Sequence, residues 1–165
     1  MRDIVMGAIL VGIGATAFMD LMAWARKQIF GTPSADYALV GRWIAYMPRG
    51  RFLHRPIAAS PSLRGEGAIG WAAHYLTGIA FAFLLLTIFG AGWLRQPAIL
   101  PALIIGIGSV AAPFLLMQPG MGLGIAARRA PKPNAARLRS LVTHLIFGIG
   151  LYLAGWAANR LGFIN

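Results

Sequence analysis

Four long apolar stretches constrain what this chain can fold into more than any other feature. They cover residues 4–25, 67–90, 99–123 and 141–158 approximately. Each is long enough to cross a lipid bilayer as a helix. Charged residues make up only 12% of the chain, about half of what a soluble domain carries. The sequence therefore predicts an all-α, four-helix transmembrane bundle that occupies residues 1–165 as a single integral membrane domain.

The basic residues indicate how these helices are oriented. Lys and Arg are concentrated in the two loops at about 26–66 and 124–140, and few lie on the opposite side. Such loops face the cytoplasm in bacterial inner-membrane proteins. We therefore expect an inner (plasma) membrane location with the N and C termini outside. The topology and the anionic lipid headgroups account for the net charge of +11, so we expect membrane lipids as partners and no nucleic acid.

The first loop contains a short amphipathic segment. Ser34 is the predicted N-cap, and Pro48 ends the segment. Its apolar residues share one helical face, which is typical of a helix lying in the membrane interface. The basic turn 48–52 follows and suits lipid phosphates. The loop is either a lipid anchor or a lid over a site that faces the cytoplasm. The residues on the apolar face are Leu39, Val40, Trp43, Ile44 and Met47.

Two pairs of segments resemble each other. Ala8–Ala17 and Ala102–Ala111 share five of ten residues, including two glycines. His74–Phe83 and His144–Leu153 share the histidine, the glycine four residues later and the isoleucine after it. This pattern predicts a parallel internal repeat of helix pairs 1–2 and 3–4. Glycines at the matching positions allow close helix contact; they are Gly12, Gly14, Gly106 and Gly108.

The repeat places one histidine in each half, and Asp20 lies in the first span. Ionisable residues inside a span are functional candidates by default. The simplest interpretation is a polar clamp in which Asp20 bonds to His74 or His144. A second is one haem b held by both histidines, with arginines near the propionates. A third is a transition-metal site that adds a carboxylate or thioether ligand. The added groups would be Arg64, Arg137 and Arg139 for haem, and Asp20, Glu66, Met19, Met117 or Met121 for a metal.

The third span carries Pro113 and ends in the irregular run 118–124. Broken helices, parallel repeats and buried polar groups are also typical of transporters, and a chain of four helices would then act as a dimer. The sequence argues against an enzyme, because its serines lack a nucleophile-elbow context and it has only four acids. The absence of cysteine excludes disulfides and thiolate metal sites.

The full set of motifs resembles a bacterial family of small four-helix integral membrane proteins, a domain of unknown function (number twenty-nine thirty-eight). The resemblance spans nearly the whole chain and implies a four-span inner-membrane protein without implying an activity. It also implies that the family's polar positions gather at the cytoplasmic end. The motifs are Met19–Leu21, Tyr37–Trp43, Met47–Phe52, His54, Gly65–Glu66, Gly70–Trp71, His74–Tyr75, Pro113–Phe114, Met117–Gly120, and His144 with Gly148.

These observations favour a protein that binds, and as a further option transports, a small or lipid-like ligand. The site would be a polar pocket at the cytoplasmic ends of the helices. Two alternatives stay open: a haem b or transition-metal protein that uses His74 and His144, and a structural subunit of a larger membrane complex. The partners we expect besides lipids are a second copy in a homodimer or a larger membrane complex. The candidate ligand-binding residues are Asp20, Arg42, Arg49, Arg51, His54, Glu66, His74, Gln118 and His144.

Overall fold

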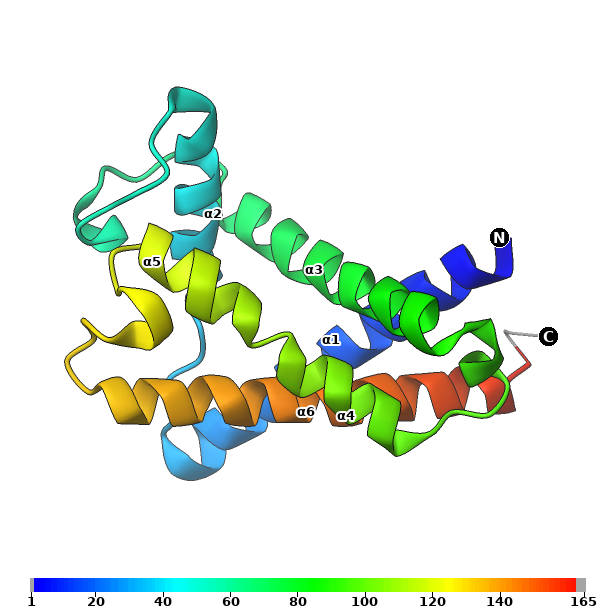
Figure 1. Cartoon of the computed structure of the whole chain (residues 1–165). Helices are drawn as coiled ribbons and strands as arrows, with labels where there is room; N and C mark the ends of the chain where they lie inside the picture. Colours follow the sequence, from blue (N-terminus) through cyan, green and yellow to red (C-terminus); the bar gives the residue numbers. More distant parts are fainter. Residues whose placement is uncertain (1, 163–165) are drawn as a thin grey trace. The chain divides into compact units, whose positions relative to one another are not determined.

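Helices and short connecting turns make up the chain. The computed structural model describes the backbone of residues 2–162 and the side chains of residues 4–162, and this range contains no β-strand (Figure 1). The predicted all-α fold is confirmed. The α-helices are α1 (Arg2–Phe30), α2 (Tyr37–Tyr46), α3 (Glu66–Phe89), α4 (Ile99–Gly108), α5 (Gln118–Gly120) and α6 (Pro133–Arg160).

Four helical stretches are long and apolar enough to cross a membrane, so the chain is a multi-pass membrane protein. They are Ile4–Phe30, Glu66–Phe89, Ile99–Gly120 and Pro133–Arg160. The first and last helices are longer than the apolar runs from which they were predicted, because polar residues at the ends of a span can continue the helix. Proline suits the first position of a helix, where its missing N–H costs nothing, and α6 begins at such a residue.

Local chemistry sets the other helix ends. Gly31, at φ +64°, follows α1 and donates its N–H to Lys27 O at 3.0 Å, as left-handed glycines do after a helix. The N-cap of α2 is Asp36, whose carboxylate accepts a hydrogen bond from Ala38 N at 3.0 Å. The prediction of Ser34 at this position was therefore wrong. The chain stays non-helical through Asp36, which places its carboxylate, rather than the Ser34 hydroxyl, beside the first free N–H groups.

The third span is interrupted, as its proline predicted. After α4, the chain passes through a π-helical turn (Pro113–Met117) before α5. The Gln118 N–H donates to Pro113 O, five residues back, which is the hydrogen bond of a wide helical turn. Proline favours such a turn because its ring displaces the preceding carbonyl, and turns of this kind occur frequently at functional sites.

Contacts along the chain divide it into two compact units. Unit 1 consists of residues 1–34, 75–109 and 142–165, and unit 2 of residues 35–74 and 110–141. Helices α3 and α6 contribute residues to both units.

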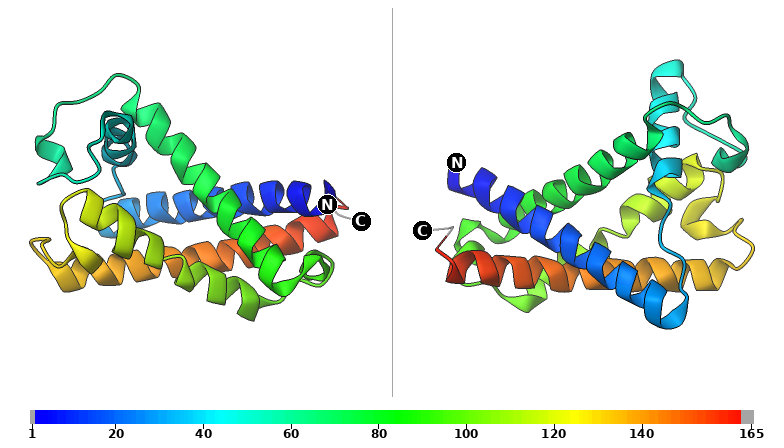
Figure 2. Two further views of the ribbon diagram at one scale, coloured as in Figure 1. Left: turned by 45° about the horizontal axis from the view of Figure 1, so that its top comes forward. Right: turned by 180° about the vertical axis from the view of Figure 1, so that it is seen from behind.

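In unit 1, α1 and α6 lie side by side and run antiparallel (Figure 2). Gly14 of α1 faces Ala154, and Gly150 of α6 faces Ala15. Small residues at these positions let the backbones approach closely, which is how helices associate in a membrane. A core of buried apolar side chains surrounds this contact: Ala8, Val11, Ala15, Ala82, Leu85, Leu86, Trp93, Leu94, Ala102, Ile105, Phe147 and Leu151.

Two further helix contacts in unit 1 use the glycines that the sequence comparison matched. Gly12 of α1 packs on the backbone of α3 at Gly78, and Gly106 of α4 packs on the backbone of α6 at Gly148. Within the two similar sequence segments, Gly12 corresponds to Gly106, and Gly78 to Gly148. Equivalent glycines therefore make equivalent contacts. The internal repeat itself stays a prediction.

Both ends of the described chain lie at the same end of unit 1. Gly7, near the start of α1, packs against the Leu94 side chain. Asn159, near the end of α6, donates from its amide to the carbonyls of Leu94 and Arg95 at 3.1 and 3.0 Å. An even number of membrane crossings requires this arrangement. Which side of the membrane this end faces stays a prediction.

Unit 2 has a smaller core of its own, built around Tyr46, Ile57 and Met121. The predicted apolar face of α2 contributes to it, since Leu39, Val40 and Trp43 pack against these residues. Helices α2 and α3 approach each other at Gly41 and Gly70, where a side chain on either glycine would collide with the opposite backbone. Whether α2 also lies in the membrane interface stays a prediction.

Candidate functional site

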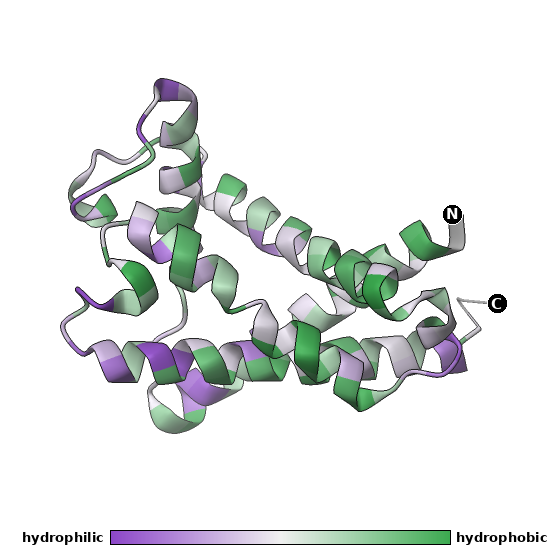
Figure 3. Cartoon of the chain, in the orientation of Figure 1, coloured by the Kyte–Doolittle hydropathy of each residue, from purple (hydrophilic) through white to green (hydrophobic). Residues whose placement is uncertain are grey.

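Unit 2 gathers most of the predicted ligand-binding residues. Hydrophilic residues are concentrated on its loops and on the first turns of α6, as the hydropathy colouring shows (Figure 3). Two of the predicted residues, Asp20 and His144, belong to unit 1. The seven in unit 2 are Arg42, Arg49, Arg51, His54, Glu66, His74 and Gln118.

Arg42 and Glu66 form a two-pronged ion pair between α2 and the first residue of α3. Both Nε–Oε2 and Nη2–Oε1 distances are 2.8 Å, and the side chains are 13% and 15% exposed. The third guanidinium nitrogen donates to Ser60 O at 3.0 Å, and Leu63 N donates to the Glu66 carboxylate at 2.8 Å. The hydrogen bond that Arg42 donates to the Glu66 carboxylate raises the pKa of Arg42 above its ordinary value. This pair fixes the loop between the two helices.

His54 is buried in that loop and uses only one side of its ring. It is 4% exposed, and its Nδ1 lies 2.8 Å from Ser60 Oγ. Its ring packs against Tyr46 with centroids 5.1 Å apart, and its backbone N–H donates to Gly120 O at 2.9 Å. The other ring nitrogen, Nε2, is buried and has no hydrogen-bond partner. A buried polar atom of this kind costs about 1–3 kcal/mol until something binds it.

Gln118 shows the same feature on the second segment of unit 2. It follows the π-helical turn and is 6% exposed. Its amide nitrogen donates to Ser140 Oγ at 3.4 Å, whereas its buried Oε1 has no partner. An amide oxygen only accepts hydrogen bonds. The group that completes this position must therefore be a donor.

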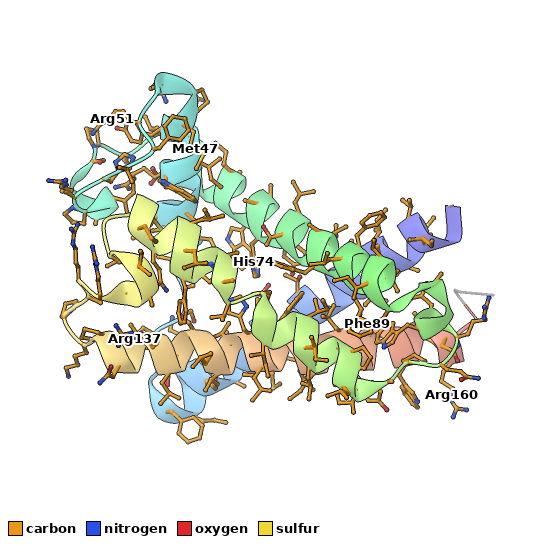
Figure 4. The ribbon with its side chains drawn as sticks, viewed as in Figure 1. Met47, Arg51, His74, Phe89, Arg137 and Arg160 are labelled. Atoms are coloured by element: carbon orange, nitrogen blue, oxygen red, sulfur yellow. The ribbon has the colours of Figure 1, made fainter. Side chains whose placement is uncertain are left out.

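The basic turn after α2 is held against that helix. The Arg51 guanidinium lies over the Tyr46 ring at 4.8 Å from its centroid, and Arg49 donates to Ala45 O at 2.8 Å. Gly50 takes φ +71°, a left-handed conformation that glycine adopts without strain. Met47 and Arg51 mark the two ends of this turn (Figure 4), which closes where Gly50 N donates to Met47 O at 2.9 Å. The turn thus presents two exposed cations on a fixed backbone.

His74 lies in an aromatic cluster rather than alone. Its ring stacks on Tyr37 with centroids 4.2 Å apart and an angle of 26° between planes, and it meets the edge of Trp71 at 5.8 Å. Tyr37 and Trp71 are themselves 4.7 Å apart. Stacking of this kind contributes about 0.5–1.5 kcal/mol beyond burial. His74 therefore helps to join α2 to α3.

The two predicted residues of unit 1 have defined partners. His144 Nδ1 lies 2.6 Å from Ser109 Oγ, and that hydroxyl donates to Gly106 O at 2.6 Å. Because the serine proton goes to the carbonyl, the histidine donates its Nδ1 proton and keeps Nε2 as an acceptor. Asp20 accepts a hydrogen bond from the Tyr75 hydroxyl at 3.2 Å. The predicted clamp between Asp20 and His74 or His144 stays a prediction.

Haem or metal binding stays a prediction. In the part of the chain that the structure describes, no group of three or more His, Asp and Glu side chains gathers as a metal site. The tautomer of His144 is the one that ligating histidines adopt, with the second nitrogen donating to a neighbour. An absorption spectrum of the oxidised and reduced protein, with metal analysis, tests both cofactors.

A strained segment follows Gln118 in the chain. Gly122 and Gly124 have positive φ values of 97° and 73°, and Ala126 and Ala127 adopt left-handed conformations at 47° and 55°. Such a conformation costs an alanine about 1 kcal/mol or more. Arg137 of α6 donates to Ala126 O at 2.9 Å and helps to hold this segment in place. Strain of this kind occurs preferentially at functional sites.

Sequence reasoning missed the partners of the site residues. Ser60, Tyr46 and Ser140 complete the surroundings of His54 and Gln118, and Ser109 orients His144. Ser109 follows the matched glycine Gly106 by three residues, a spacing that lets a serine hydroxyl bond back to the helix. Tyr46 of α2, Ser60 of the loop and Ser140 of α6 reach their partners through tertiary contacts, for which the sequence offers no local signal.

Comparison with known proteins gives one result. No curated protein and no solved structure matches the chain. A family model described as "Protein of unknown function (DUF2938)" matches residues 9–158. That range includes all nine candidate site residues and the whole of unit 2. The chain therefore belongs to the DUF2938 family of proteins of unknown function.

Proposed function

We propose that this protein binds an anionic, lipid-like ligand through unit 2, at the cytoplasmic face of a bacterial inner membrane with both termini outside. One observation carries the proposal: two buried polar atoms of unit 2, His54 Nε2 and Gln118 Oε1, have no hydrogen-bond partner. Native proteins leave few such atoms, and each calls for a ligand, an ion or a bound water.

The charges of unit 2 support an anionic ligand. Its sequence has two acids, and both serve local structure: Asp36 caps α2, and Glu66 pairs with Arg42. The sequence of unit 2 therefore contains no further carboxylate that could pair with the remaining cations. They attract phosphate or carboxylate groups, and the fork of arginine suits both. They are Arg49, Arg51, Arg55, Arg64, Arg128, Arg129, Lys132, Arg137 and Arg139.

The two unpaired atoms refine the ligand class. Gln118 Oε1 requires a donor such as a hydroxyl or an amine, and His54 Nε2 bonds to a hydroxyl in either tautomer. A headgroup that combines an acid with hydroxyls meets both needs. The four apolar spans keep such a ligand's hydrocarbon tails in the membrane. Glycerol phosphate headgroups have this chemistry, and we use phosphatidylglycerol as the probe.

Thermal unfolding of the detergent-purified protein tests the proposal. Added phosphatidylglycerol should raise the midpoint of the native protein more than phosphatidylcholine does, because a ligand at ten times its Kd stabilises by about 1.4 kcal/mol. Gln118→Met has nearly the same volume and removes the unpaired oxygen together with the long 3.4 Å hydrogen bond to Ser140, which is the weaker of the two effects. We expect the lipid-free variant to be more stable by about 1 kcal/mol and to lose most of the response to lipid.

Ser62→Ala is the matched control, because Ser62 is an exposed hydroxyl of the same unit. It should respond to phosphatidylglycerol like the native protein. An equal response in native protein, control and Gln118→Met would show that the lipid acts as a solvent for the spans and would contradict a site at Gln118.

A further inference from the structure

Two large apolar side chains are exposed in the basic turn of unit 2. Phe52 is 57% exposed and Leu53 is 73% exposed, although the next residue, His54, is buried. An aromatic and an aliphatic side chain side by side in water cost free energy in proportion to their exposed area. Exposed apolar side chains of this kind mark a surface that contacts a partner or a membrane.

The backbone around this pair is fixed on both sides. Before it, Arg51 N donates to Tyr46 O at 3.2 Å. Within it, the Trp43 indole donates to Phe52 O at 2.9 Å, and beyond it His54 N donates to Gly120 O at 2.9 Å. Their outward position is therefore not the result of a loose loop. The fold holds them in an exposed position, so little conformational freedom is lost when they bind.

Cations surround the pair. Arg49, Arg51 and Arg55 flank it within three residues on each side and are all exposed. The sequence contains no acid between Asp36 and Glu66. An apolar tip with arginines around it matches the lipid interface, where acyl chains lie below a layer of phosphates.

We propose that Phe52 and Leu53 form a wedge that inserts into a bilayer of anionic lipids, while the flanking arginines contact lipid phosphates. Insertion buries the apolar area that the fold leaves exposed. The arginines keep their charge in the headgroup layer, where each contributes about 1 kcal/mol of attraction. The inference shares the arginines of the turn with the proposed function, but Phe52 and Leu53 take no part in the ligand site at Gln118, so a label at position 53 tests the wedge separately from that site.

Site-directed spin labelling tests the wedge in the full chain, which has no cysteine and so takes a single label cleanly. The protein with Leu53→Cys is labelled and reconstituted in vesicles of phosphatidylglycerol and phosphatidylcholine. Ser62→Cys, exposed in the same loop, is the control. We expect the label at 53 to be several-fold less accessible to a water-soluble nickel complex than the label at 62, and more accessible to oxygen.

Two outcomes would overturn the proposal. Equal nickel accessibility at both positions would show that the turn stays in water. Shielding from both reagents, with dipolar broadening between labels, would show that a second copy of the chain covers the pair. Arg49→Gln with Arg55→Gln supplies a further check: it should reduce insertion in anionic vesicles and have little effect in vesicles of phosphatidylcholine alone. Insertion that is unchanged in the anionic vesicles would remove the role given to the arginines.

Discussion

The two units pack their helices in the same way and differ in how they treat polar groups. Unit 1 uses glycine contacts at Gly12 and Gly106, and unit 2 uses them at Gly41 and Gly70. In unit 1, the buried hydroxyls of Thr16 and Ser109 donate to the carbonyl oxygens of those two glycines. In unit 2, two buried side chains each leave one polar atom unpaired. The buried hydroxyls of unit 1 are thus satisfied within their own helices, whereas unit 2 keeps two unpaired polar atoms on which its proposed ligand site rests.

Arg26 is the exception in unit 1, because its buried Nε also lacks a partner. Its situation differs, however. Arginine has five donors, and another of them donates to Thr143 Oγ1 at 3.4 Å. Arg26 also lies at the basic end of α1, where lipid phosphates are expected. The exception therefore marks the edge of unit 1 rather than its core.

The largest effect is expected where a helix contact in unit 1 is forced apart. In Gly106→Ala, the new methyl group would collide with the backbone of α6 at Gly148. Overfilling of this kind costs about 3 kcal/mol, so the variant should unfold at a clearly lower denaturant concentration. Gly108→Ala is the control in the same helix, because no atom lies within 4 Å of its added carbon. Equal stability of the two variants would refute close packing as the basis of unit 1.

A smaller loss is expected when the ion pair of unit 2 is broken. Arg42→Met leaves the Glu66 carboxylate largely buried without its partner and removes the bond to Ser60 O. We expect a loss in the free energy of unfolding that is smaller than that of Gly106→Ala, because solvent near the pair screens the carboxylate that remains. Arg49→Met is the control, since Arg49 is exposed, donates to the backbone at Ala45 O, and lies over the Tyr46 ring at 5.8 Å from its centroid, without an acidic partner in the described part of the chain.

Lipid binding by Arg42→Met distinguishes a structural role of Arg42 from a role in ligand binding. If Arg42 only holds the loop, Arg42→Met should weaken the response to phosphatidylglycerol in proportion to its loss of stability. Arg49→Met should weaken the lipid response with little loss of stability. The reverse pattern would assign ligand binding to Arg42 and remove Arg49 from the site.

The sequence predicted the spans because membrane helices need long apolar runs, a requirement visible without tertiary contacts. It also predicted the irregular third span from Pro113 and the glycines after it. The same reasoning failed at Ser34, because two residues that cap helices stand close together there, and only the path of the chain selects Asp36. Such a selection depends on backbone conformation over several residues, which no local pattern determines.

The candidate site was predictable by residue type but not by partner. Arg42 and Glu66 stood out as charged residues near spans, yet their pairing depends on where Gly41 and Gly70 bring α2 and α3 together. The burial of His54 was not predictable, because a histidine between Leu53 and Arg55 is typical of an exposed loop. Its burial follows from the contact between its backbone and Gly120, sixty-six residues away along the chain.

The smallest effect is expected within unit 1, where the helix contacts at Gly12 and Gly106 differ in the hydroxyl that bonds to each glycine. Thr16 Oγ1 donates to Gly12 O at 2.7 Å, and Ser109 Oγ both donates to Gly106 O and accepts from His144. Ser109→Ala should cost about 1 kcal/mol, because it leaves the histidine N–H without its acceptor. Thr16→Val should cost about half as much, because its hydrogen bond lies within α1 and its loss leaves no buried donor unpaired. Unfolding of both variants under the same conditions measures the difference.

Equal losses would mean that His144 finds another acceptor, and the serine would then have no special part in orienting it. A larger loss in Ser109→Ala would instead show that the hydrogen bond from His144 stabilises the contact at Gly106, whereas the contact at Gly12 has no such bond from Thr16.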